Sequence, residues 1–365
     1  MKHYKHTKMN TKLFFLFFFL IGPFCRGTAQ NTLPTRGFCI AAPSPDRLDE
    51  FVRFIDQELA PRNVNTLVLR VDYNYAFESH PELREDNVLT RADVGKLVAV
   101  CRQHSIRLIP QINLLGHQSW ASKTGKLLSV YPQFDETPNV QMPEKYEWPN
   151  PDGLYCKSYC PLHPQVHAVV FDLVDEICDA FETDAFHAGM DEVFYIGHDD
   201  CKRCAGRDKA ELYANEVNKI ANHLALKNRQ LWIWGDRLID GKTTGIGEWE
   251  ASMNHTHRAI DLINKDVMIC DWHYDRPVQT AVYFAMKGLS VVSCPWKKGE
   301  VAVAQREDML RFRQQATHEM APRYQGVMQT VWSGAGSFLD EFYGRKSAGA
   351  ESESACFKAL FEKAG

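Results

Sequence analysis

The sequence lacks the features that mark several large classes of protein. It has no internal repeat, no low-complexity linker and no cluster of basic residues, and past its N-terminus no apolar run approaches the roughly 20 residues that cross a bilayer. A formal net charge of −4 also argues against nucleic acid as a partner. We therefore expect a globular chain without stable membrane insertion, and no feature of the sequence predicts a cofactor.

The N-terminus is strongly apolar and predicts export. Four lysines precede the run "LFFLFFFLIGPF", and "RGTAQ" follows it. A basic region, a short apolar core and small residues are typical of a secretory signal peptide, here residues 1–29, cleaved before Gln30. The core is too short for a membrane anchor. We expect a periplasmic or secreted mature chain, residues 30–365. A lipoprotein is less favoured because "GPFC", which ends at Cys25, is a poor lipobox.

Eleven cysteines include one in the predicted signal peptide, which leaves ten in the mature chain. An even number fits disulfides in an oxidising compartment. Two close pairs, Cys156/Cys160 and Cys201/Cys204, also have spacings that metal ligands use. Because the two pairs lie in different predicted loops, we favour local disulfides or free thiols over a zinc site. We assign no metal ligand.

Short β-branched, apolar runs alternate with amphipathic stretches along the mature chain. Eight such runs predict strands, at residues 37–42, 66–72, 106–113, 185–191, 231–236, 267–272, 289–294 and 327–332. Residues 164–181 and 209–224 carry apolar side chains at the spacing of one helix face. This alternation predicts an α/β protein, a single (β/α)8 TIM barrel after the signal peptide, whose core needs no partner chain. A doubly wound open sheet is the alternative, although no glycine-rich phosphate turn follows the first strand.

Carboxylates and aromatic residues collect at the carboxyl ends of the predicted strands, where (β/α)8 barrels place their active sites. These residues are Asp72, Asn113, His117, Asp191, Glu192, Asp236, Trp272, Tyr274, Trp296 and Trp332. Aromatic faces cover the apolar faces of a pyranose and carboxylates bind its hydroxyls, so this rim predicts a sugar site. The connection from Leu114 to His163 has no clear helix or strand. A loop of this length is usually functional, and we expect it to overhang the fourth strand.

Asp191 and Glu192 stand side by side where the fourth predicted strand ends. Neighbouring side chains of a strand point to opposite faces, so both reach one pocket only if the chain leaves the pleat here. Two carboxyl groups at one centre push their pKa values apart, which provides the acid and the anion of glycoside hydrolysis. A solvated helix start is the alternative, because acidic residues are favoured there. The position after a buried strand favours the site.

"HAGMDE" resembles the H-x-G-G-D-E signature of glycoside hydrolase family 20, the β-N-acetylhexosaminidases. Upstream, "PQINLLGH" resembles that family's P-E-x-D-x-P-G-H pattern, in which Pro110, Gly116 and His117 match. Trp332 in "TVWSG" fits the tryptophan that ends the eighth strand. The resemblance extends over the whole predicted barrel and is specific around strands three, four and eight. Three residues differ from the upstream pattern, namely Gln111, Asn113 and Leu115.

The resemblance implies that the chain removes terminal β-linked N-acetylhexosamine from glycans by a retaining, substrate-assisted mechanism. Glu192 would protonate the leaving glycosidic oxygen and then activate water. Asp191 would orient the substrate's own 2-acetamido group and stabilise its positive charge as the carbonyl oxygen attacks C1. The resemblance implies no enzyme nucleophile.

Further residues are expected to bind substrate. By the resemblance, tryptophans of the later strands form walls around the acetamido methyl group, and the candidates are Trp272, Trp296 and Trp332. Tyr274 is the candidate for holding the acetamide oxygen. From their positions, we expect His117 and His187 in a polar network beneath the carboxylates. Asp236 is expected to bind a sugar hydroxyl or to pair with Arg237.

The sequence departs from the family at the residues that grip the sugar. The family has an arginine at the end of strand one and a glutamate shortly after the tryptophan of strand eight. Here strand one ends in "IAAPSPDR", and Ser333 and Gly334 follow that tryptophan. Met190 stands where the family has glycine. These changes concern the identity of the sugar and exo-specificity more than the chemistry.

Two other classes of function stay open. One is a glycan-binding barrel without turnover, which would have no need of a buried acid. The other is a metal-dependent barrel enzyme whose ligands come from one segment after strand four. Those residues are His198, Asp199, Asp200, Cys201 and Cys204. A catalytic metal usually draws its ligands from several strands, which argues against the second class.

Overall fold

A computed structural model describes residues 1, 32–142, 144–145 and 156–362. Apart from Met1, the predicted signal peptide lies outside the described residues, and its cleavage stays a prediction. Within the described ranges, no helix is long and apolar enough to cross a membrane.

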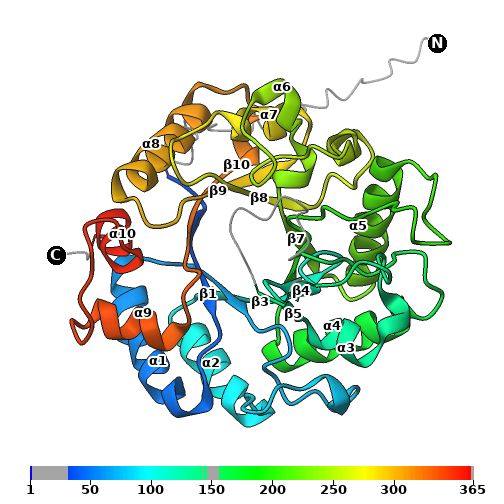
Figure 1. Cartoon of the computed structure of the whole chain (residues 1–365). Helices are drawn as coiled ribbons and strands as arrows, with labels where there is room; N and C mark the ends of the chain where they lie inside the picture. The colour runs from blue at the N-terminus through cyan, green and yellow to red at the C-terminus, as the bar shows by residue number, and fades with distance from the viewer. Residues whose placement is uncertain (2–31, 143, 146–155, 363–365) are drawn as a thin grey trace.

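Eight parallel strands close into a barrel that helices surround (Figure 1). The strands are β1 Thr35–Ala41, β2 Thr66–Arg70, β3 Arg107–Leu114, β6 Ala185–Gly189, β7 Gln230–Trp234, β8 Met268–Trp272, β9 Ser290–Cys294 and β10 Tyr324–Thr330. Each overlaps one of the eight predicted strands. Because β1 pairs with both β2 and β10, the sheet has no free edge. The predicted (β/α)8 barrel is confirmed, and the open-sheet alternative is excluded.

Helices cover the outside of the barrel (Figure 1). The longer ones are α1 Leu48–Phe54, α2 Arg91–Gln103, α4 Val166–Phe181, α5 Lys209–Ala225, α7 Thr280–Met286, α8 Gly299–Gln315, α9 Ala335–Phe342 and α10 Glu353–Leu360. Between β7 and β8 the chain forms only the short helix α6, Gly241–Thr244, and two 3-10 helices, Asp236–Leu238 and Thr256–Asp261. One strand–helix unit therefore lacks a full-length helix.

The two helices predicted from apolar spacing are present as α4 and α5. Asp208 caps the N-terminus of α5, because its carboxylate accepts the backbone N–H groups of Ala210 and Glu211. The chain leaves α4 at Glu182, whose φ of 49° is left-handed and ends the helix. Periodicity located both helices because each buries one continuous face against the barrel.

The long connection between β3 and α4 contains regular structure that the sequence did not reveal. Its described part holds a two-stranded hairpin, β4 Ser119–Trp120 and β5 Lys123–Thr124, and the five-residue helix α3, Lys126–Val130. The expectation of no helix or strand is therefore wrong for this part. Elements this short span too few residues to leave a periodic pattern. Residues 146–155 of the connection lie outside the described residues.

The barrel interior is filled by side chains that point inward from the strands. This inner cluster comprises Cys39, Val68, Ile109, Ala185, Trp232, Trp234, Met268, Cys270, Trp272, Val292, Cys294 and Met328. Trp249, Tyr274 and Trp332 are partly buried against it. The inner cluster thus continues into a group of aromatic residues near the carboxyl ends of the strands, where the predicted site residues lie.

Candidate active site

The chain leaves the pleat of β6 at the predicted point. Gly189, Met190 and Glu192 all have positive φ, at 66°, 66° and 49°. At Gly189 a Cβ atom would lie 2.3 Å from the side-chain oxygen of Asn113, so this position needs glycine. The Tyr213 hydroxyl donates to the Met190 carbonyl at 2.9 Å and holds the turn. With these backbone torsions, successive side chains no longer alternate between the two faces of a strand.

His117 lies between the two adjacent carboxylates. Its Nδ1 is 3.4 Å from Oδ1 of Asp191, and its Nε2 is 3.3 Å from Oε2 of Glu192. The three side chains are only 16%, 10% and 14% exposed. Trp120 stacks on the outer face of the imidazole, with ring centroids 5.9 Å apart. One imidazole therefore brings Asp191 and Glu192 to the same place from its two nitrogens.

The charges of this group favour an ion pair between His117 and Asp191. Burial alone would raise the pKa of the Asp191 carboxyl, but the positive charge of His117, 3.4 Å away, holds it below its usual value. Burial would likewise lower the pKa of His117, but Asp191 and then Cys156 raise it well above the usual value. Asp191 is therefore an anion, and His117 a cation, at neutral pH.

Asp236 holds the backbone of the carboxylate pair. Its Oδ2 accepts the backbone N–H of Glu192 at 2.9 Å and Nε of Arg237 at 2.6 Å, and its Oδ1 accepts Nε1 of Trp272 at 3.3 Å. Burial, with a smaller contribution from Asp191, raises the pKa of Asp236 to about 6 although Arg237 opposes this. Asp236 was expected to bind a sugar hydroxyl or to pair with Arg237, and the structure shows the pair with Arg237. Asp236 also positions Glu192.

Cys156 is a contact of Glu192 that sequence reasoning missed. Its thiol donates to Oε2 of Glu192 at 3.3 Å. Burial raises the pKa of this thiol to about 12, so it remains protonated and able to donate. The signal for it was indirect, since Cys156 belongs to the long connection that we expected to overhang the fourth strand.

The predicted aromatic residues form one connected group. Nε1 of Trp332 donates to the Tyr274 hydroxyl at 2.8 Å, and Tyr274 lies between the rings of Trp272 and Trp296, with centroids 5.1 and 5.4 Å away. Trp332 also packs on Trp234 at 5.7 Å. The four residues named from the sequence thus come together, and Trp234 joins them from the barrel interior.

His187 lies below this group and has a different role from His117. It is fully buried, accepts the backbone N–H of Gly189 through Nδ1 at 3.0 Å, and packs on Trp234 at 4.5 Å. It therefore supports the turn that carries the carboxylates. His117 therefore contacts the two carboxylates directly, whereas His187 holds the backbone of the turn that precedes them.

A family model described as glycosyl hydrolase family 20, catalytic domain, matches residues 64–352. The chain belongs to glycosyl hydrolase family 20. The match runs from before β2 to the start of α10 and so includes most of the barrel. The resemblance drawn from the motifs around strands three, four and eight is confirmed.

Individual relatives are distant and longer than this chain. A lacto-N-biosidase from Bifidobacterium bifidum is 24% identical over 244 residues, which cover 63% of this chain and 18% of the relative. A β-hexosaminidase from Emericella nidulans is 26% identical over 123 residues, which cover 32% of this chain and 19% of the relative. The matched region thus spans about a fifth of the length of either curated relative.

Solved structures share the fold of this family 20 chain. A chitobiase from Flavobacterium johnsoniae aligns with a TM-score of 0.63 at 16% identity, covering 91% of this chain and 48% of the other. A β-N-acetylhexosaminidase from Bacteroides fragilis aligns with a TM-score of 0.59 at 15% identity, covering 85% and 63%. At these identities, the likeness establishes the barrel architecture.

Two charged residues that the sequence did not single out flank Trp332 in this family 20 barrel. The guanidinium of Arg70, at the end of β2, lies 4.7 Å from the centre of the Trp332 ring and donates to the Val331 carbonyl at 2.9 Å. Glu353, at the start of α10, accepts the backbone N–H of Trp332 at 2.7 Å and Nε1 of Trp296 at 2.6 Å. An arginine and a glutamate therefore lie next to this tryptophan, although they come from other positions than in the family pattern.

Of the two alternatives expected for the cysteines, local disulfides or free thiols, the structure shows free thiols. All ten described cysteines are free thiols, so neither close pair forms a disulfide. Cys156 contacts Glu192, while the Cys160 sulfur lies 3.5 Å from that of Cys204 and 3.3 Å from that of Cys201. The two loops that the sequence left apart therefore meet. Of the ligand set suggested within one segment, Cys201 and Cys204 come together, whereas His198 lies 3.7 Å from Asp200 outside that group of described residues.

Proposed function

We propose that this family 20 chain hydrolyses glycosidic bonds of β-linked N-acetylhexosamine at the end of a glycan. The observation that carries the proposal is the pair Asp191 and Glu192, held against opposite nitrogens of His117 and next to a connected group of tryptophans. The names of the relatives, a lacto-N-biosidase, a β-hexosaminidase and a chitobiase, agree with it.

Glu192 is the proposed general acid and base. In its protonated form it donates to the glycosidic oxygen as the bond to C1 breaks, and its anion then takes a proton from water that attacks C1. Its backbone is held by Asp236 and its side chain by Cys156 and His117. These contacts fix the carboxyl group in one orientation, which a proton donor to a single oxygen requires.

Asp191 is the proposed partner of the substrate's acetamido group. The acetamide oxygen attacks C1 and closes a ring that carries positive charge, and Asp191 accepts the acetamide N–H and stabilises that charge. The role requires an anion, which agrees with the lowered pKa of this carboxyl beside His117. In this scheme the nucleophile belongs to the substrate, so the sugar is released with its configuration retained.

The aromatic group supplies the proposed walls of the sugar site. Trp332 donates to the hydroxyl oxygen of Tyr274, and the O–H of Tyr274 is the proposed donor to an acetamide oxygen. Trp272 is tied to Asp236 and therefore holds a fixed position relative to the carboxylates. Arg70 lies over the ring of Trp332, and Glu353 accepts the backbone N–H of the same residue, so both charges lie beside this wall.

The first test compares two aryl β-glucosides that differ only at C2, where one carries an acetamido group and the other a hydroxyl. We expect turnover of the acetamido substrate to exceed that of the hydroxy substrate by orders of magnitude. Asp191→Asn should slow only the acetamido substrate, by roughly two to three orders of magnitude, because an anion that faces developing charge is lost. Equal rates on the two wild-type substrates would contradict substrate assistance.

The second test varies the leaving group. Glu192→Gln should lose roughly 10²- to 10⁴-fold of kcat on a natural glycan and much less on a dinitrophenyl glycoside, whose leaving group needs little protonation. Glu211→Gln, an exposed residue of α5, is the matched control and should behave as wild type. Equal losses on both substrates would remove Glu192 from the acid role. Tight binding of N-acetylhexosamine without turnover would identify a glycan-binding barrel instead.

A further inference from the structure

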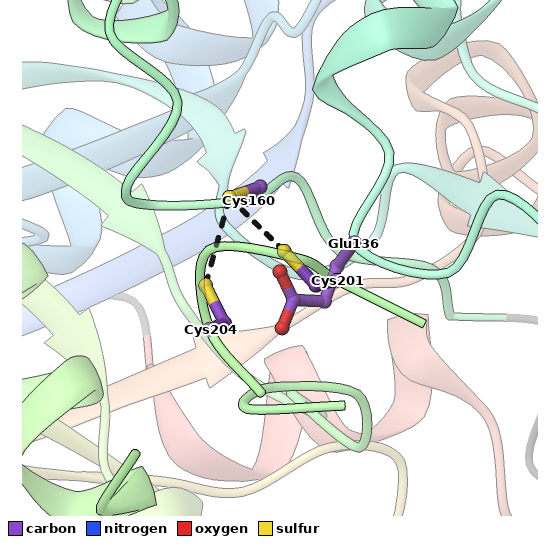
Figure 2. A group of neighbouring side chains, drawn as sticks. All are labelled: Glu136, Cys160, Cys201 and Cys204. Carbon is purple, nitrogen blue, oxygen red and sulfur yellow. Dashed lines mark hydrogen bonds between the residues drawn. The ribbon is translucent and has the colours of Figure 1, made fainter. Parts of the chain in front are cut away.

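Four buried side chains away from the carboxylate pair form a second polar centre. They are Glu136, Cys160, Cys201 and Cys204, called here the Cys3Glu cluster (Figure 2). The first two come from the connection between β3 and α4, and the other two from the connection between β6 and α5. The cluster therefore joins two loops that are distant in sequence.

The four possible donor atoms lie close together. The Cys160 sulfur is 3.3 Å from the Cys201 sulfur and 3.5 Å from the Cys204 sulfur, and all four donor atoms lie within 4.8 Å of one another. Figure 2 shows the Glu136 carboxylate beside the sulfurs of Cys201 and Cys204. Four donors around a Zn²⁺ ion at about 2.3 Å lie roughly 3.8 Å apart, so small outward shifts complete a tetrahedron.

Ordinary packing does not account for this group. Three thiols can form at most one disulfide, and the third would be left over; in the structure all three are free. Glu136 is fully buried, and its Oε2 has no hydrogen-bond partner among the described residues. A buried carboxylate oxygen without a partner is costly unless a cation or donor reaches it.

A metal ion binds cysteine as the thiolate and displaces the thiol proton. The three sulfurs of the cluster are buried and close enough to share one ion, so the geometry of the side chains carries the assignment.

We propose that the Cys3Glu cluster binds one Zn²⁺ ion through three thiolates and the Glu136 carboxylate. Zinc is the metal that tetrahedral sets of cysteine sulfur with one nitrogen or oxygen donor favour. Because the protein supplies all four ligands, the site is structural, with no position left for a substrate.

The zinc ion ties down the loops above the barrel. Cys160 follows Cys156, which contacts Glu192, and Cys201 follows the turn that carries both carboxylates. The backbone N–H of His198, three residues before Cys201, donates to the other oxygen of Glu136 at 3.1 Å. The ion therefore joins the two loops whose residues position the candidate acid. This inference stands independently of the proposed function, because it concerns how the loops are held, not which bond is cleaved.

The test measures metal in the full chain, purified without chelator or added reductant. Elemental analysis should find about one zinc per chain in the wild type. The ion should be lost in Cys204→Ser. Its binding should be weaker in Glu136→Gln, which is a near-isosteric change. Replacement of zinc by Co²⁺ should give the visible bands of tetrahedral cobalt and thiolate charge-transfer absorption, both weakened by Cys160→Ser.

Two matched variants distinguish this cluster from the other buried thiols of the chain. Cys178→Ser removes a buried thiol of α4 outside the cluster and should keep the zinc. Cys156→Ser removes the thiol of a second possible ligand group, formed with His117 and Glu192, and should also keep it. Zinc lost in Cys156→Ser but kept in Cys204→Ser would overturn the proposal. So would a disulfide within the cluster by mass spectrometry, or failure of the reduced wild type to bind added zinc.

Discussion

Replacing His117 by glutamine tests the electrostatics of the candidate site. The imidazolium of His117 lies 3.4 Å from Asp191 and 3.3 Å from Glu192, so the change removes one positive charge between two carboxylates. Glutamine keeps a polar side chain of similar reach. Without the charge, burial and the neighbouring carboxylate both raise the pKa of Asp191.

The size of the effect follows from these distances. At an effective dielectric constant near 20, unit charges at 3.4 Å attract by about 5 kcal/mol, which is a ceiling. Solvent and the cost of desolvating the histidine reduce it, and we expect a net loss of about 2–3 kcal/mol for the Asp191 anion. At low pH this corresponds to roughly a 30- to 150-fold loss of kcat/KM, because each 1.4 kcal/mol changes a rate tenfold.

The assay is kcat/KM against pH on an aryl 2-acetamido-β-glucoside. In the wild type the pKa of Asp191 is lowered, so this residue is charged at any pH above that pKa. Activity should be lost only when the pH falls through the pKa of Asp191. In His117→Gln the acidic limb should move to higher pH, with recovery in more alkaline buffer. His223→Gln, which removes a contact between α5 and Asp175 of α4, is the control. An unmoved limb, or a uniform loss at every pH in a folded variant, would refute the electrostatic role.

Three further outcomes are expected. Burial would lower the pKa of His273, but its carboxylate partners raise it to about 9. The protonated side chain therefore stabilises the fold by at most roughly 3 kcal/mol, fully below the usual histidine pKa of 6.5 and no longer once the pH has risen through 9. The free energies of urea unfolding of wild type and His273→Gln should therefore converge at alkaline pH. Gly189→Ala should lower the free energy of unfolding by more than about 2 kcal/mol, because φ is positive and the new methyl group meets Asn113, whereas Gly95→Ala in α2 should raise it slightly. Mass spectrometry of exported protein should find an N-terminus near Gln30, and intact cytoplasmic protein would contradict the predicted signal peptide.

Local sequence patterns were enough to predict most of the fold. The eight strands were recognised because each is a short apolar run that is buried on both faces, and α4 and α5 because each buries one stripe of side chains. The rule that barrels place their sites at the carboxyl ends of strands then selected Asp191, Glu192 and the aromatic residues. The hairpin and helix α3 were missed because they are too short to carry a period.

Contacts between loops were decided only by the tertiary structure. Nothing in the spacing of Cys156 and Cys160 shows that one contacts Glu192 while the other meets Cys201 and Cys204. Glu353 likewise reaches the tryptophans at the ends of two other strands from a helix near the C-terminus. Loop backbones take their torsions from close packing and individual hydrogen bonds, which have no repeat for a pattern to detect. The sequence by itself therefore determined the barrel and the pair of carboxylates at its rim. The closed fold alone decided which histidine, thiol and aspartate hold that pair in place.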